Sequence, residues 1–169
     1  MTTIMLNENV NIGSIHCNVF ATERPEVLLI QPSARHETKN DGINREVKVL
    51  AATATKGFAI VFFDTVEWAK ALMPWQDEAV SRDEEVGMHA QDTLVYIEES
   101  LVPWLHERFG KLPCIIGGYS LGGLFALWAA RKSAAFCAVA AASPSLWIKG
   151  WTDYADNNSL NAQLAYISL

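Results

Sequence analysis

The sequence predicts an α/β fold in which a mainly parallel central sheet carries helices on both faces. The first observation is that short apolar runs bounded by turn residues alternate with stretches in which apolar residues recur at helical spacing. The second is that most of these runs are apolar on both faces, which is typical of strands in a parallel sheet covered by helices. Half of the 169 residues are hydrophobic, so a single domain spanning 1–169 can bury a sizeable core.

The first two expected strands are 12–20 and 27–31. The first alternates apolar and polar residues, as an antiparallel strand with one buried face does, and that face carries Ile15, Cys17 and Val19. The second is a short, uninterrupted apolar run that Pro32 closes, as expected of a buried strand.

A helix and another buried strand are expected next. Gly57 ends the helix, whose apolar residues recur at helical spacing: Ile43, Val47, Leu50 and Ala54. The strand 58–63 follows and ends at Asp64. The charged stretch 66–85 is expected to be an excursion with little regular structure.

The second half begins with a long amphipathic helix over 89–109, bent at Pro103. Its buried stripe consists of Leu94, Ile97, Leu101 and Leu105. Beyond it, a helix rich in small residues is expected over 121–132. Strands are expected on both sides of that helix, at 114–119, 136–142 and 164–169.

Ligands of parallel α/β sheets bind beyond the carboxyl ends of the strands. Four turns are therefore expected at one edge of the sheet, which we term the functional rim. They follow Gln31, Asp64, Tyr119 and Ser143.

Charge and composition exclude several classes of protein. Thirteen Lys and Arg face nineteen Asp and Glu, the net charge is −6, and the basic residues do not cluster, so we expect no nucleic-acid partner. No apolar run is long enough for a membrane span, and residues 1–10 lack the features of a secretory signal. Three widely spaced cysteines indicate buried thiols in a reducing cytoplasm, and no metal-ligand spacing is present.

The strongest motif is Gly118-Tyr119-Ser120-Leu121-Gly122, which matches the G-x-S-x-G nucleophile elbow. An expected buried strand precedes it and an expected helix follows it, as the motif requires. Such a turn strains the backbone and lifts the serine hydroxyl above the sheet edge. Gly118 and Gly122 are expected to avoid collisions where strand and helix approach each other.

The elbow predicts a specific chemistry. Ser120 is the expected nucleophile, and it precedes a helix whose amino-terminal N–H groups favour negative charge. The N–H of Leu121 is therefore expected to donate to the oxyanion of a tetrahedral intermediate.

Residues 118–130 and the run 140–147 (AAASPSLW) resemble the esterase D and enterochelin-esterase-like branch of the α/β-hydrolases. The resemblance implies hydrolysis of a small-molecule carboxylic ester through an acyl-enzyme, with no cofactor. It also implies a second oxyanion donor in the turn after 27–31. Relatives often carry His-Gly there. This chain has Gln31-Pro32-Ser33, and because proline has no N–H, Ser33 is the candidate donor.

The resemblance places the triad acid just after the strand at 165–169, and the histidine after one further strand. All four histidines precede Ser120 in this chain. We therefore expect the chain to be the amino-terminal part of a longer, truncated domain that lacks its C-terminal strands. His36 is the best upstream candidate for a base. An unpaired sheet edge would favour pairing with a second copy, as a homo-oligomer.

Three aromatic residues beside the expected rim are candidates for a substrate pocket: Tyr119, Trp147 and Trp151. Two alternatives to ester hydrolysis stay open. One is a catalytically degenerate binding module that keeps the fold without the triad. The other is an acyltransferase that uses the same nucleophile with an alcohol acceptor.

Overall fold

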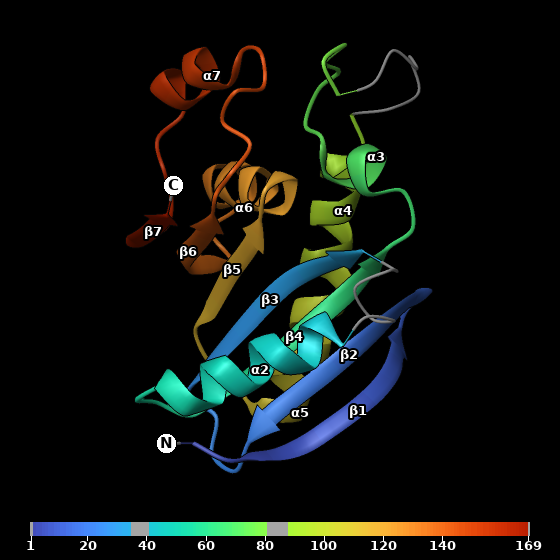
Figure 1. The fold of residues 1–169 in the computed structure, drawn as a ribbon, viewed down its shortest axis with the longest axis vertical. Helices are drawn as coiled ribbons and strands as arrows, with labels where there is room; N and C mark the ends of the chain where they lie inside the picture. Colours follow the sequence, from blue (N-terminus) through green and yellow to red (C-terminus); the bar gives the residue numbers. More distant parts are fainter. Residues whose placement is uncertain (1, 35–40, 81–87, 169) are drawn as a thin grey trace.

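A seven-stranded sheet organises the computed structural model, which describes residues 2–34, 41–80 and 88–168 (Figure 1). The strand order is β1-β2-β4-β3-β5-β6-β7. The strands are β1 (Ile4–Ile12), β2 (Ile15–Thr22), β3 (Val27–Ala34), β4 (Phe58–Thr65), β5 (Cys114–Tyr119), β6 (Phe136–Ala142) and β7 (Leu164–Ser168).

The five strands from β4 to β7 in this order run parallel, which confirms the mainly parallel sheet. β1 and β2 are antiparallel and form a hairpin at one edge of the sheet. The expected strand 12–20 is therefore wrong in its start, because Gly13, at a φ of 61°, turns the chain between two strands. The predicted face of β2 is confirmed, since Cys17 and Val19 are fully buried.

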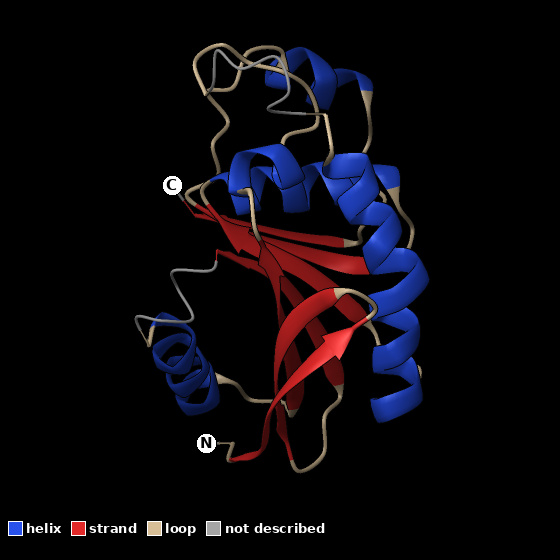
Figure 2. Cartoon of the chain, turned by 90° about the vertical axis from the view of Figure 1, so that its right-hand side faces the viewer, coloured by secondary structure: helices blue, strands red, loops and turns tan. Residues whose placement is uncertain are grey.

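Helices cover both faces of the sheet (Figure 2). α2 (Gly42–Thr53) covers one face and buries Ile43, Val47 and Ala51 against aromatic residues of β2 and β4. The other helices are α3 (Trp68–Leu72), α4 (Ala90–Tyr96), the π-helical turn η1 (Ile97–Leu101), α5 (Val102–Phe109), α6 (Leu121–Lys132) and α7 (Trp151–Asn157). Residues of α3 to α7 contribute to the larger core cluster, on the opposite face.

The long helix expected over 89–109 is continuous from α4 through η1 to α5. Pro103 has no N–H for the carbonyl four residues earlier, and the backbone adjusts with a π-turn in which the N–H of Val102 bonds to the carbonyl of Ile97. The predicted buried stripe is confirmed, since Leu94, Ile97, Leu101 and Leu105 are all buried.

Because β3, β4, β5 and β6 are parallel, their carboxyl ends lie at one edge of the sheet, where the functional rim was expected. The described part of the chain contains no helix that is both long and apolar enough to cross a lipid bilayer. The three cysteines are free thiols, and two of them, Cys17 and Cys114, are buried.

Candidate active site

Ser120 lies at the junction of β5 and α6, at the functional rim. Its backbone has a φ of 54° and a ψ of −117°, in a region that residues with a side chain rarely adopt. A serine at the start of a helix usually caps it by accepting a hydrogen bond from an N–H of the first turn. The side chain of Ser120 makes no such bond. Its hydroxyl instead lies 3.2 Å from the hydroxyl of Ser145.

The glycines on either side of Ser120 are needed for different reasons. A Cβ at Gly118 would lie 2.5 Å from the carbonyl carbon of Gly122, so no side chain fits between β5 and α6 there. A Cβ at Gly122 would instead lie 3.3 Å from the ring of Pro32 and 3.4 Å from that of Trp68. The close approach expected of the elbow is thus between backbones at Gly118 and between helix and side chains at Gly122.

Leu121 is the first residue of α6, and its side chain is buried. Its N–H is one of the amino-terminal amides of the helix, where the aligned peptide dipoles favour negative charge. This is the position expected for an oxyanion donor next to Ser120.

Ser33 does not have the orientation expected of a second donor. In a β-strand, the N–H and C=O of one residue point toward the same neighbouring strand, and successive residues alternate between neighbours. The N–H of Leu28 in β3 bonds to Pro113 at the start of β5, whereas the carbonyl of Ser33 accepts the hydroxyl of Thr65 on β4, at 3.1 Å. The N–H of Ser33 therefore points toward β4 and away from Ser120, which corrects the expectation.

The side chain of Ser33 joins a polar network at the same end of the sheet. It is buried, and its hydroxyl donates to Asp64 at 3.1 Å. The other carboxylate oxygen of Asp64 lies 3.2 Å from Nδ1 of His16. Ser33 thus holds the ends of β3 and β4 together rather than facing the elbow.

The three candidate pocket residues have different environments. Tyr119 and Trp147 are exposed, at 63% and 66% of their surface. Trp151 is only 5% exposed and stacks on Trp75, so it forms no part of an open pocket wall. Tyr119 lines two neighbouring cavities on the α2 side of the sheet, of about 290 and 230 Å³. Both cavities are also lined by Gln31 and Glu46.

An aromatic bridge joins the excursion after β4 to the segment after β6; we define it as Trp75, Trp151 and Tyr154. The ring centroids of Trp75 and Tyr154 are 5.4 Å apart, and the indole N–H of Trp75 donates to the carbonyl of Lys149 at 2.8 Å. Asp77 strengthens the bridge. Its carboxylate accepts the N–H groups of Ala79 and Lys149, and these bonds lower the pKa of Asp77.

The described histidines contact residues outside the elbow. His16 lies beside Asp64, His89 is 2.8 Å from Asp92, and Nε2 of His106 is 3.6 Å from the thiol of Cys114. His36, the upstream candidate for a base, lies outside the described residues.

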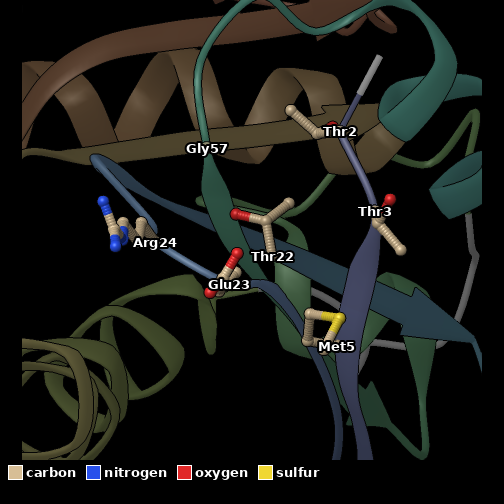
Figure 3. A pocket seen from close by; sticks show the side chains of 7 residues that line it. All are labelled: Thr2, Thr3, Met5, Thr22, Glu23, Arg24 and Gly57. Atoms are coloured by element: carbon tan, nitrogen blue, oxygen red, sulfur yellow. The ribbon is translucent and has the colours of Figure 1, made fainter.

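A further cavity of about 490 Å³ lies at the opposite end of the sheet, where β2 ends and β4 begins (Figure 3). Its most buried polar group, Thr22, exchanges two hydrogen bonds with the backbone of Phe58. This cavity is separate from the elbow. It is lined by Thr2, Thr3, Met5, Thr22, Glu23, Arg24 and Gly57.

Sequence reasoning missed Ser145 and the aromatic bridge. Ser145 comes 25 residues after Ser120, and only the fold brings the two hydroxyls together. The A-S-P-S-x-W turn that contains Ser145 was the one available signal, and it was used only for the resemblance.

Solved structures with a similar fold include three hydrolase-related proteins. They are an IroE-like serine hydrolase from Shewanella oneidensis (TM-score 0.67, 17% identity, 90% of this chain and 54% of that chain), the siderophore hydrolase EstB from Aspergillus nidulans (0.62, 20%, 86% and 58%) and the BES protein from Bacillus cereus (0.62, 16%, 99% and 76%). The chain thus spans little more than half the length of the first two. At these identities the likeness shows the fold, that of the α/β-hydrolases.

No curated protein matches the chain significantly by sequence. The model of the Esterase family, described as "Putative esterase", matches residues 21–166, which include the elbow and all the strands from β3 to β6. This chain therefore belongs to the Esterase family, within the esterase branch of the α/β-hydrolases.

Proposed function

We propose that this protein hydrolyses carboxylic esters through an acyl-enzyme formed on Ser120. The observation that supports the proposal is the backbone of Ser120, whose positive φ sets its hydroxyl at the rim and away from the helix cap. Glycine would adopt this conformation without strain, so a serine here has a cost that catalysis explains. Membership of the Esterase family supports the same chemistry.

In the proposed reaction, Oγ of Ser120 attacks the ester carbonyl carbon while a base takes the hydroxyl proton. The N–H of Leu121 donates to the oxyanion of the tetrahedral intermediate. Collapse of that intermediate breaks the bond to the alcohol, which leaves with a proton. Water then attacks the acyl-enzyme and restores Ser120.

The proposal assigns the proton of Ser120 to a base outside the described residues, since the three described histidines contact other groups. The size of this contribution is large. Loss of the histidine of a serine triad costs on the order of 10⁶ in turnover, and the oxyanion hole and substrate binding retain roughly 10³ over water. Ester turnover by the 169-residue chain is therefore expected to be marginal, and a stoichiometric probe tests the site better.

The test is incubation of the chain with a fluorophosphonate, which bonds irreversibly to an activated serine. After trypsin, mass spectrometry should find the label on the peptide 112–131, which contains Ser120. Ser143 and Ser145 fall in a different peptide, 133–149, so the two sites are distinguished by mass. S120A is expected to remain unlabelled. An unlabelled wild-type chain, or a label that survives in S120A, would favour a degenerate binding module.

Product analysis separates hydrolysis from acyl transfer. With an added alcohol acceptor, a hydrolase releases mainly the free acid, whereas an acyltransferase makes the new ester. Because EstB is a siderophore hydrolase, we propose a siderophore ester for the substrate panel, beside simple acetyl and butyryl esters.

A further inference from the structure

The segment Ala142–Ser145, just after β6, binds Ser120 through three of its atoms. The N–H of Ser120 donates to the carbonyl of Ala142 at 2.9 Å, and its carbonyl accepts the N–H of Ser145 at 3.1 Å. The two hydroxyl oxygens, of Ser120 and Ser145, are 3.2 Å apart. The backbone and the side chain of the elbow serine are therefore both held by one short turn.

The turn that carries Ser145 is itself fixed in place. Ser143 has a φ of 41°, which reverses the chain after β6, and its N–H bonds to the carbonyl of Ser168 at 2.8 Å. Pro144 packs so closely on α6 that a Cβ at Gly123 would lie 3.1 Å from it. Ser145 is only 5% exposed, so water competes little for its hydroxyl.

The direction of the hydrogen bond between the two hydroxyls follows from the reaction. Ser120 must direct its own proton to the base if it is to become a nucleophile. The hydroxyl of Ser145 can then only donate to Oγ of Ser120. A donor in this position fixes the rotamer of Ser120, and it stabilises negative charge on Oγ when the proton leaves.

We infer that Ser145 is a positioning residue that orients Oγ of Ser120 and stabilises its deprotonated form. The inference rests on the proposed function, because it assigns Ser145 a part in activating the same nucleophile. It adds a residue that acts from another strand end, 25 positions along the chain.

The test measures charge stabilisation at position 120 without requiring any ester turnover. In S120C the introduced thiol replaces Oγ, and its pKa is read from the pH dependence of alkylation by iodoacetamide. A hydrogen bond to the charged form lowers a pKa, so adding S145A should raise that thiol pKa by about one unit and slow alkylation near neutral pH about tenfold.

The native thiols do not obscure this measurement. Cys114 lies in the same tryptic peptide as position 120, but burial raises the pKa of its thiol to about 11. Below pH 9 the introduced thiol should therefore react first, and fragmentation of the peptide 112–131 assigns the modified position.

Two further variants distinguish a hydrogen bond from a change of packing. S145T keeps a hydroxyl and should leave the thiol pKa near its value in S120C. S143A removes an exposed hydroxyl from the same turn and serves as the matched control, with no expected shift. Circular dichroism confirms folding, and S145G deletes the same hydroxyl if S145A does not fold.

Equal thiol pKa values in S120C with and without S145A, or an equal rise in S143A, would overturn the inference. This outcome is independent of the fluorophosphonate result. If the wild-type chain takes up no label while the pKa shift is present, the proposed function fails and the contact between the two hydroxyls stands. If it takes up label, S145A should slow labelling about tenfold and S145T should restore the rate.

Discussion

At the scale of single residues, Ser120 combines a strained backbone with the proposed chemistry. A positive φ outside the usual left-handed region costs a side-chain-bearing residue about 1–3 kcal/mol, whereas glycine adopts it freely. The protein retains serine there, at the one position of the elbow where a hydroxyl reaches the rim.

This strain predicts a difference between two variants that both lack the hydroxyl. S120G should be more stable than S120A by about 1 kcal/mol, because glycine relieves the backbone strain and alanine does not. Urea unfolding at constant pH measures the difference. Both variants lose the contact with Ser145, so that loss cancels in the comparison. Equal stability of the two would show that the backbone at 120 relaxes.

Sequence reasoning reached the elbow but only part of its surroundings. The spacing of Gly118, Ser120 and Gly122 is local, so the sequence alone predicts it. The orientation of Ser33 is not local, since it depends on how far β3 continues. Pro32 stays within the strand because its missing N–H faces β5, and pairing between β3 and β5 ends at Ile30.

At the scale of elements, the buried strands and the helix after the elbow matched their predicted bounds because their apolar patterns are continuous. β5, α6 and β6 begin and end where expected. β1 was missed although it alternates regularly, with half-buried Ile4, Leu6 and Val10. α7 was missed because its polar sequence is helical only through the packing of Trp151 and Tyr154.

The aromatic bridge predicts a response to acid. The N–H groups of Ala79 and Lys149 lower the pKa of Asp77 below its ordinary value of 3.8, so the carboxylate form is favoured in the folded state. Its contribution is complete above pH 3.8 and is lost as the pH falls through the lower folded-state pKa. The amide proton of Lys149 should therefore shift during an acid titration followed by NMR.

Two variants test the assignment of that titration. In D77N the shift of the Lys149 amide in this pH range should disappear. D156N, which changes an exposed aspartate of α7, should leave it unchanged. A titration that persists in D77N would assign the effect to another carboxylate.

At the scale of the whole molecule, burial is concentrated in the centre of the sheet. Every apolar side chain of β4 is buried, whereas β7 at the edge exposes Leu164, Tyr166 and Ile167. The sequence predicts both as apolar strands. It does not show which lies at the edge, because strand order depends on contacts between distant segments.

This gradient predicts unequal costs for removing two aromatic rings. F63A should lose about 3–5 kcal/mol of unfolding free energy, because Phe63 is fully buried against Tyr96. Y166A should change it by less than about 0.5 kcal/mol, since the side chain is mostly exposed. Chemical denaturation gives both values. A large loss in Y166A would indicate that the ring is covered in solution, for example by a second copy.

The left-handed backbone at Ser120 also has a consequence for attempts to improve this protein. A library screened for heat resistance alone would enrich glycine at this codon, and the hardiest clones would be those that had discarded their reactive group. Directed evolution of this fold should therefore select for catalysis and robustness together in every round.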